Sequence, residues 1–433
     1  MCSSVVHVRS PLSANRIIVD QCATLDTGGN RRLSSMKRYL FAWECGAGLG
    51  HLARYQGLIQ LLLERGHEVM FASRNLECAQ RVYGHLPVRL IQAPLHQRQP
   101  EDMVRPKSYL DVLINQGFDH SLGLKARVKA WRHLLEMWQP SAIVADHSPT
   151  LLLAQRLDER AACIVGGNGF CIPPMLHPFP PFDGQLAYCR EDFIQREQDL
   201  LNRVVNPVLR DLGGRTMEHC QQLFSPHPHW LFGLPGLDHY PGRRAETYLG
   251  ASPSMGGEPA SWPDAPGPRV FVYLKPHRVV SQVLTTLRKL QWPTVIFAPD
   301  WPEELKQKAQ GSNMWLSNKP FDLQSVGKSC QLAVSNGGVN GVTELLLQGI
   351  PQLLLPLHIE QLMFSRSAQA TGACLVRLLV DSNDLQGLRN ALEAVADSAG
   401  VLKKAALEFS ENQVKSTTVQ AGDLLRQLQS SSP

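Results

Sequence analysis

The chain lacks the cysteine pairs and the long apolar runs that mark several large classes of protein. Its ten cysteines are scattered singly and form no CxxC pair or metal-type spacing. We therefore expect reduced thiols, no metal site and a cytoplasmic protein. The longest apolar stretches, such as residues 353–357, fall far short of the roughly 20 residues that span a bilayer. The sequence thus predicts a protein that is not integral to a membrane.

Concentrated positive charge is also missing. The net charge is +5, which is too small an excess for the basic patches of nucleic-acid-binding proteins, so we expect no nucleic-acid partner. One basic stretch, at residues 125–132, has two readings. It could touch an anionic bilayer, which would be a peripheral contact at most, or it could be an ordinary solvated helix face.

What the chain does have is enough apolar sequence for more than one core. Hydrophobic residues make up 43% of its 433 positions and charged residues 19%, as in ordinary globular proteins. A single core stops growing at roughly 250 to 300 residues, so at least two domains are expected. Residues 1–35 are polar and without periodicity, and we expect them to be a disordered or non-native extension ahead of Met36.

From residue 38 onward, apolar runs alternate with helical patterns, which is typical of βα units that form a parallel sheet. The series is interrupted by proline and glycine between about residues 233 and 268 and then resumes. We predict an α/β protein with two doubly wound, Rossmann-like domains, at residues 36–250 and 269–415. A linker at 251–268 joins them, and a C-terminal helix and tail follow at 416–433. The carboxyl ends of both sheets should face one interdomain cleft.

The first chemical signal follows the first predicted strand, residues 39–43, and consists of a glycine-rich turn at residues 46–50 and then His51. Such a turn is weak evidence alone, and His51 stands where a dinucleotide motif needs its third glycine. An imidazole in this position could be a general base or could simply cap its own helix. Asp146 ends a strand expected in the same sheet and could orient His51, while His147 is a rival base.

The second signal is the run from Ser335 to Glu344, which contains Gly337, Gly338 and Gly341. Glycines permit close backbone approach, and the N-terminus of the following helix offers free N–H groups to a diphosphate. Glu344 lies about two turns into that helix. A glycine-rich turn that merely caps a core helix is the structural alternative.

Together these stretches resemble the UDP-glycosyltransferase superfamily, glycosyltransferase family one, particularly its bacterial members that act on natural products and lipids. The resemblance rests on residues 48–51, on residues 65–69, on the run 336–344 and on Gly349, Ile350, Pro351, Pro356, Glu360 and Gln361. It covers most of the chain from Met36 to about Val376. It implies the GT-B fold, with an acceptor-binding first domain and a donor-binding second domain.

The resemblance also implies roles for individual residues. His51 would be the catalytic base and Asp146 its partner. Glu344 matches the acid that binds the ribose hydroxyls, and Glu360 with Gln361 matches the pair that holds the donor sugar. In the donor motif Asn340 matches the usual asparagine, whereas Asn336 replaces a diphosphate-binding histidine and Gly341 replaces a serine.

These two replacements remove phosphate donors, although the amide of Asn336 and the N–H groups of Gly337 and Gly338 could still donate. Lys275 or His277 could compensate with positive charge, or could belong to a solvated basic loop. For the wall against the nucleotide base we select Phe321, next to Pro320.

The implied reaction is an inverting, metal-independent transfer of a hexose from a UDP or dTDP sugar to an acceptor hydroxyl, without a cofactor. Residues 97–123 and the aromatic, proline-rich residues 170–182 are expected to be loops over a partly apolar acceptor, which could be a small molecule or a lipid. Two alternatives remain: a nucleotide-sugar epimerase of the same fold, and a catalytically inactive nucleotide-sugar-binding or partner protein.

Overall fold

The computed structural model describes residues 36–46, 48–184, 189–243, 247–252, 256–378, 384–397, 400–413 and 420–431. The extension at residues 1–35 lies outside the described residues. So do Ala47 of the first glycine-rich turn, residues 253–255 of the expected linker, and residues 416–419 and 432–433 of the expected tail.

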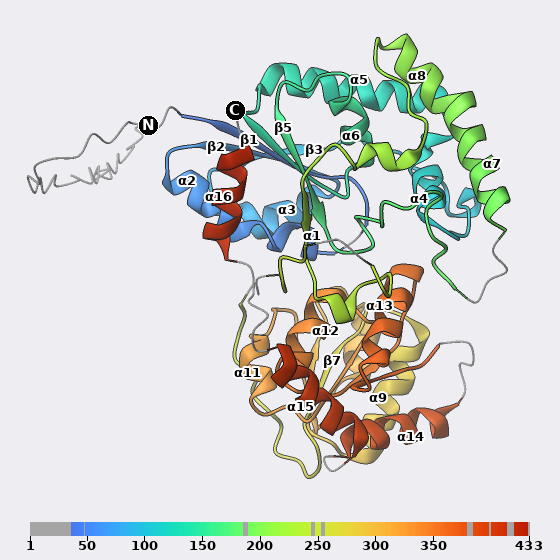
Figure 1. The fold of residues 1–433 in the computed structure, drawn as a ribbon. Helices are drawn as coiled ribbons and strands as arrows, with labels where there is room; N and C mark the ends of the chain where they lie inside the picture. The colour runs from blue at the N-terminus through green and yellow to red at the C-terminus, as the bar shows by residue number, and fades with distance from the viewer. Residues whose placement is uncertain are drawn as a thin grey trace, which may run out of the picture. The chain divides into compact units, whose positions relative to one another are not determined.

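The first sheet is built from six parallel strands in the order β3-β2-β1-β4-β5-β6 (Figure 1). These strands are β1 (Arg38–Trp43), β2 (Glu68–Ser73), β3 (Arg89–Gln92), β4 (Ala142–Asp146), β5 (Ala162–Gly167) and β6 (His229–Leu231). The order reverses between β1 and β4, and Trp43 pairs with Asp146 at their carboxyl ends. This switch point is where ligands bind in open α/β sheets.

Both faces of this sheet are buried, because alternate side chains of each strand pack into two different apolar cores. The helices of this part are α1 (Gly50–Ala53), α2 (Gln56–Glu64), α3 (Leu76–Tyr83), α4 (Tyr109–Leu113), α5 (Ser121–Trp138), α6 (Pro149–Gln155), α7 (Arg190–Leu200) and α8 (Asn206–Asp211). One core includes α5 and α6, and the other includes α2 and α3.

The second sheet repeats the design with six parallel strands in the order β12-β11-β10-β7-β8-β9. They are β7 (Val270–Tyr273), β8 (Thr294–Phe297), β9 (Met314–Ser317), β10 (Leu332–Ser335), β11 (Gln352–Leu354) and β12 (Cys374–Val376). Its helices are α9 (Arg278–Leu290), α10 (Glu303–Lys308), α11 (Leu323–Gly327), α12 (Val339–Leu346), α13 (Ile359–Ala370), α14 (Leu385–Ala396) and α15 (Val401–Gln413).

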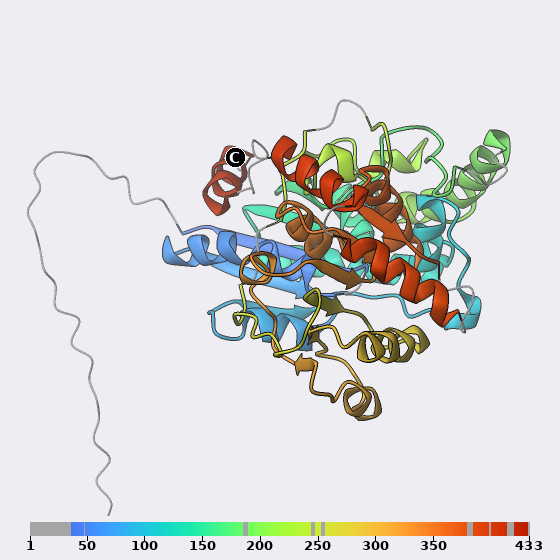
Figure 2. The same ribbon diagram turned by 90° about the horizontal axis from the view of Figure 1, so that it is seen from below.

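The last helix, α16 (Ala421–Ser431), belongs by its packing to the first sheet rather than the second. It lies beside α2 in both views (Figures 1 and 2) and buries Leu424, Leu425 and Leu428 in the core that contains Tyr55. Its Gln427 Oε1 also accepts a hydrogen bond from Trp230 Nε1 at 2.6 Å. The end of the chain is therefore anchored on the first domain.

The structure confirms the predicted two-domain α/β architecture and corrects one loop. Residues 97–123 contain α4, whose five residues are all buried, so this stretch contributes to the core. Within the described residues, no helix combines the length and apolar character needed to cross a bilayer.

Candidate active site

His51 and Asp146 meet at the switch point of the first sheet. His51 lies in α1, directly after the turn that follows β1, and Asp146 is the last residue of β4. The His51 Nδ1 and Asp146 Oδ1 atoms are 2.6 Å apart, and both side chains are buried. Because an ionised carboxylate only accepts hydrogen bonds, it fixes the proton on Nδ1 and leaves Nε2 as the basic nitrogen.

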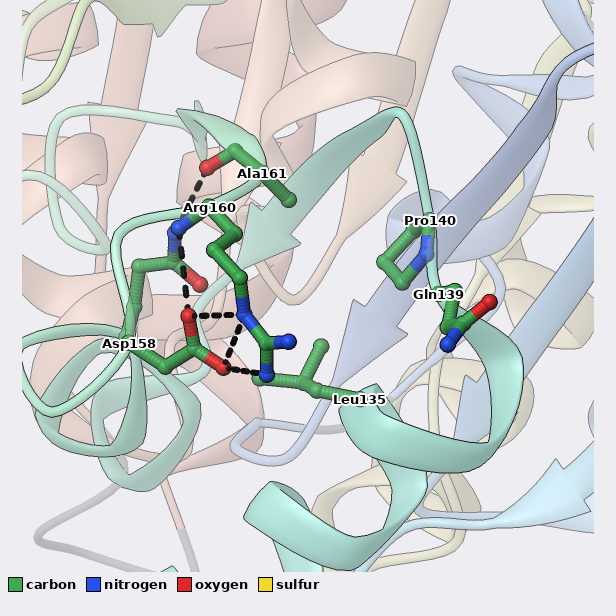
Figure 3. A pocket seen from close by; sticks show the side chains of 7 residues that line it. Leu135, Gln139, Pro140, Asp158, Arg160 and Ala161 are labelled. Atoms are coloured by element: carbon green, nitrogen blue, oxygen red, sulfur yellow. Dashed lines mark hydrogen bonds and ion pairs between the residues drawn. The ribbon is translucent and has the colours of Figure 1, made fainter.

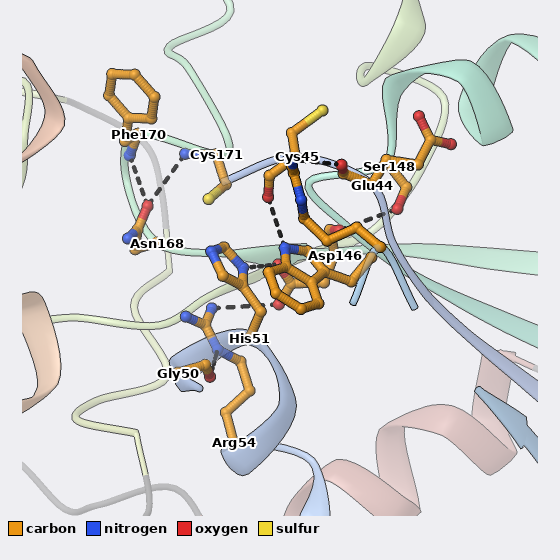
Figure 4. A network of polar contacts seen from close by, with 12 residues as sticks. Glu44, Cys45, Gly50, His51, Arg54, Asp146, Ser148, Asn168, Phe170 and Cys171 are labelled. Carbon is orange, nitrogen blue, oxygen red and sulfur yellow. Dashed lines mark hydrogen bonds and ion pairs between the residues drawn. The ribbon is translucent and has the colours of Figure 1, made fainter. Parts of the chain in front are cut away.

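The second oxygen of Asp146 has partners of its own, which keep the carboxylate charged (Figure 4). Tyr55 donates its hydroxyl to Oδ2 at 2.7 Å, and the Arg54 guanidinium lies 3.4 Å from the same atom. Burial by itself would raise the pKa of Asp146. The charges of Arg54 and His51 and the hydrogen bonds of His51 and Tyr55 outweigh it and hold that pKa below its ordinary value.

The His51 ring is fixed from its faces as well as from its Nδ1 edge. It stacks on Trp43 with the ring centroids 5.1 Å apart and an interplanar angle of 14°. The other ring nitrogen, Nε2, faces Gly46, where a Cβ would lie only 2.9 Å away. Any side chain at this position would therefore crowd the nitrogen that must receive a proton. Gly46 also has a φ of +90°, which favours glycine.

His147, the rival base, lies close by in a different environment. Its ring centroid is 6.2 Å from that of His51, and neither of its nitrogens has a hydrogen-bond partner among the described residues. Burial, and secondarily the charge of His51, lowers the pKa of His147 to about 4. An imidazole with so low a pKa is a weak base at neutral pH, and this favours His51.

In the second domain the glycine-rich turn leads from β10 into α12. Gly337 has a φ of +80°, and a Cβ there would lie 2.2 Å from Ser365 Oγ of α13, so the turn can pack against α13 only with glycine. Gly338 is exposed at the N-cap of α12 and has no side-chain cap. The first N–H groups of α12 are thus available to a ligand.

Asn336 has a structural function in this turn. Its Oδ1 accepts a hydrogen bond from the backbone N–H of Lys275 at 2.7 Å, and its Nδ2 donates to the backbone carbonyl of Leu355 at 2.8 Å. The side chain, 5% exposed, thereby joins the ends of β7, β10 and β11. Gly341, by contrast, has open space: a Cβ there would meet no atom within 4 Å.

Asn340 and Glu344 lie on the face of α12 that lines a small pocket, which residues of both domains border. The first domain contributes Asn168, Phe232 and Gly233 to its lining. Asn340 also reaches toward α1, since a Cβ at Gly50 would lie 3.2 Å from Asn340 Nδ2. The donor motif and the His51 helix therefore border the same interdomain cleft.

Glu360 connects the two halves of the site. It lies in the first turn of α13, and its Oε1 accepts a hydrogen bond at 3.0 Å from Nδ2 of Asn168, which follows β5 of the first domain. Burial opposes ionisation, but the charges of His239 and His51 and the bond from Asn168 hold the pKa of Glu360 below its ordinary value. Gln361, its neighbour, accepts a hydrogen bond from the backbone N–H of Leu357.

Three other predicted residues lie apart from this cluster. Lys275 forms an ion pair with Asp300, with Nζ and Oδ2 2.5 Å apart. The His277 side chain caps α9 by accepting a hydrogen bond from the backbone N–H of Val279. Phe321 is 3% exposed and packs edge-on against Phe271 in the core of the second domain. Its ring is therefore part of the core, which corrects the expectation of an open wall against a base.

The structure also adds residues that the sequence pattern did not indicate. Arg54 and Tyr55 directly follow α1. Both side chains contact Asp146 and therefore belong to the His51 cluster. Glu44, at the end of β1, accepts backbone hydrogen bonds from Thr150 and Leu151 at the start of α6. Burial raises the pKa of Glu44 to about 7.

A separate surface hollow of about 500 Å³ lies elsewhere in the first domain (Figure 3). It is lined by Pro140 and Ala161, which precede β4 and β5, and by Arg160, which pairs with Asp158. This is the amino-terminal edge of the sheet. Ligands of such folds bind at the opposite, carboxyl edge, where His51 and Asp146 lie.

Residues 328–413 match the sequence model of the family described as UDP-glucoronosyl and UDP-glucosyl transferase. Among curated proteins no sequence matches the chain significantly.

Solved structures match over nearly the whole chain. The glycotransferase of kitacinnamycin has a TM-score of 0.65 at 16% identity, covering 91% of this chain and 100% of its own. Spinosyn rhamnosyltransferase SpnG, solved with thymidine diphosphate, has a TM-score of 0.62 at 18% identity, with 91% and 100% covered. SnogD from Streptomyces nogalater has a TM-score of 0.60 at 15% identity, with 92% and 100% covered. The family match lies within the second domain, and the solved glycosyltransferase structures share the fold of nearly the whole chain, which confirms the predicted GT-B architecture.

Proposed function

We propose that this glycosyltransferase moves a hexose from a UDP or dTDP sugar to a hydroxyl of a small, partly apolar acceptor by direct displacement. His51 Nε2 removes the proton of the acceptor hydroxyl, and the resulting oxygen attacks the anomeric carbon. The nucleoside diphosphate leaves from the opposite face, so the configuration inverts. In this proposal residues 36–250 bind the acceptor and residues 269–415 bind the donor.

The observation that carries the proposal is the buried hydrogen-bonded pair of His51 and Asp146, which lies at the carboxyl edge of the first sheet. Asp146 fixes the tautomer of His51 at 2.6 Å, and Glu360 of the other domain is close enough for the charge of His51 to affect its pKa. An oriented base beside a carboxylate that can accept sugar hydroxyls is suited to deprotonating one hydroxyl while holding others. The intact His51–Asp146 pair argues against a catalytically inactive binding protein.

For the leaving group we propose the N-terminus of α12. Its N–H groups and helix dipole favour a diphosphate, and the exposed Gly338 allows close approach. Glu344, further along the helix, would accept the ribose hydroxyls. Since this stabilisation needs no divalent ion, turnover should persist when Mg²⁺ and Mn²⁺ are omitted, and strict dependence on either ion would overturn this part.

Aromatic side chains surround His147, which lies beside His51. The His147 ring packs edge-on against Phe170 and beside Tyr109, with centroids about 6 Å apart in each pair, and all three side chains are buried. We propose that an acceptor which approaches His51 next to this aromatic core carries apolar rings and is not a free sugar. The structural neighbour SpnG has also been solved with a spinosyn aglycone, which supports the same class of acceptor.

The free and mostly buried cysteines of the described residues are compatible with a reducing compartment, and we propose the cytoplasm. The acceptor could be a soluble small molecule or a lipid. For a lipid acceptor we propose at most a peripheral contact with a bilayer, through Lys125, Lys129 and Arg132 and not through Arg127, which is buried.

The stereochemical test uses a donor of known α configuration and follows the anomeric proton of the product by NMR. A β-configured product that forms only with acceptor supports the proposal. Retention of configuration would rule out single displacement. An altered sugar formed without acceptor would identify an epimerase, and nucleotide binding without any product would identify a binding protein.

A further inference from the structure

A second cluster of ionisable side chains lies in the first domain outside the active site. It consists of His177 in the proline-rich loop after β5, Glu197 in α7, and His219 just before the short 3-10 helix η4 (Cys220–Leu223). One possible ligand atom from each of the three residues lies within 4.8 Å of the other two. Residues separated by about 20 positions in the sequence thus converge at one point.

Several polar atoms of this cluster are buried and form no hydrogen bonds with one another. The Glu197 side chain is 2% exposed, and its Oε1 accepts the backbone N–H of Cys220 at 2.8 Å. Its Oε2 is 3.0 Å from His177 Nδ1, but the pair is misaligned for a hydrogen bond. Within the described residues, Glu197 Oε2, His177 Nδ1 and His219 Nδ1 all lack a hydrogen-bond partner. A buried carboxylate in this state is costly unless a cation balances it.

We propose that His177, Glu197 and His219 form a Zn²⁺ site. Two imidazole nitrogens and one carboxylate oxygen are a ligand set that zinc accepts, with water in the remaining position. Ligand atoms about 2.0–2.2 Å from a tetrahedral ion are about 3.3 Å from each other, which side-chain rotations can reach from the observed cluster. Among the described ion pairs no Lys or Arg is paired with Glu197, whose partner there is His177, one of the three ligands.

The described residues contain one other group with suitable atoms, formed by His51, Asp146 and Cys171. There the Arg54 guanidinium lies 3.4 Å from Asp146, and Tyr55 and His51 already occupy the two carboxylate oxygens. A resident positive charge and filled oxygens disfavour a cation. Zinc is therefore assigned to the His177 cluster and not to the catalytic pair.

The bound ion would join the proline-rich loop to α7 and to the segment before η4. The loop backbone is already held by Arg190, which donates to the His177 carbonyl at 2.6 Å, and by Gln221, which donates to the Leu176 carbonyl at 2.7 Å. Two residues beyond His177, the Phe179 ring packs against Tyr109 of the acceptor side. Zinc would thus stabilise the loop next to the acceptor wall, in a site that holds whether or not the proposed reaction is correct.

The test is titration of the full chain, stripped of metal, with Zn²⁺ by calorimetry and with Co²⁺ by its ligand-field absorption. We expect one ion per chain. His219→Gln and His177→Gln should each weaken binding by at least about 100-fold, because loss of even an outer-sphere partner costs 10- to 100-fold. His133→Gln, at an exposed histidine of α5, is the matched control and should bind as the wild type does.

Melting of each variant without metal shows whether it is folded, and only folded variants are compared. If His219→Gln does not fold, His177→Gln and Glu197→Gln decide. The proposal is overturned if the wild type binds no ion, if folded ligand variants bind as tightly as the control, or if His51→Ala abolishes the binding instead.

Discussion

At the scale of single residues, Asp146 determines whether His51 can act as a base. Asp146→Asn replaces an acceptor by an amide that can donate, so Nδ1 loses its fixed proton and the tautomer is no longer selected. We expect turnover to fall by roughly 10² or more with little change in donor binding. Tyr55→Phe, which removes the hydrogen bond to Oδ2 alone, should cost less. Equal turnover of Asp146→Asn and wild type in steady-state kinetics would contradict this role.

His147 should make stability depend on pH. Its pKa is lowered to about 4. Between pH 6.5 and pH 4, His147 is therefore protonated in the unfolded chain and neutral in the folded chain. Stability therefore falls as the pH falls through this window, by up to about 3.4 kcal/mol.

Asparagine tolerates the φ of 43° at this position, so His147→Asn is the suitable variant. Urea unfolding at pH 7 and pH 4.5 should show a smaller loss of stability for His147→Asn than for wild type. His133→Asn, at an exposed histidine, should lose as much as wild type. If both variants lose the same amount, His147 is not the group responsible.

The residues on strand ends were predictable, and those that complete the site were not. His51 lies just after β1 and Asp146 is the last residue of β4, and neighbouring parallel strands bring their carboxyl ends together. Arg54, Tyr55 and Asn168 also contact the site. Their positions depend on the backbone geometry just after α1 and after β5, which the sequence pattern does not specify. The pairing of His177 with Glu197 and His219 has no sequence signal, because their spacing matches no metal motif.

At the scale of elements, α12 can be tested by restoring a side chain. The family resemblance implies a serine at the position of Gly341, and a Cβ there would meet no atom within 4 Å. Gly341→Ser should add a hydrogen bond to the charged diphosphate and tighten nucleoside diphosphate binding by roughly tenfold or more. Gly422→Ser in α16, where a Cβ is equally unhindered, controls for the general benefit of replacing a helical glycine. Unchanged affinity in calorimetry would remove the diphosphate from this end of α12.

Glu344 tests the other end of the same helix. As a carboxylate that accepts ribose hydroxyls, it should contribute roughly 1.5 to 3 kcal/mol to nucleotide binding. Ligand at about 100 times its dissociation constant adds roughly 2.7 kcal/mol to stability, so saturating UDP or dTDP should raise the melting temperature of the wild type. Glu344→Ala should lose most of that rise, whereas Glu408→Ala, exposed on α15, should keep it. A full shift in Glu344→Ala would contradict the assignment.

The elements that the sequence did not single out are short or lack a clear boundary signal. β5 ends in Gly166 and Gly167, and β6 and β12 have three residues each, so neither length nor alternation distinguishes them from loops. α4 was hidden for a different reason. Its five residues are buried on every side, including Asp111, and such a helix has no amphipathic period.

At the scale of the whole molecule, the two domains are linked by polar contacts at the cleft. Besides the bond from Asn168 to Glu360, Ser367 Oγ donates to the Asp238 carbonyl at 2.6 Å, and Arg366 pairs with Asp183 at 3.0 Å. Glu360, Arg366 and Ser367 all lie on α13, so this helix of the second domain makes all three of these contacts with the first domain. In the proposed reaction both domains therefore act together on one donor and one acceptor.

The most direct test of that claim is the rate at which nucleoside diphosphate is released from UDP and dTDP sugars, with and without an acceptor, by wild type and by His51→Ala. We predict release that depends on the acceptor in the wild type, and a rate roughly 10² to 10⁴ lower in His51→Ala at unchanged donor affinity. A His51→Ala protein that turns over at the wild-type rate would contradict the account, because the base would then lie elsewhere in the site.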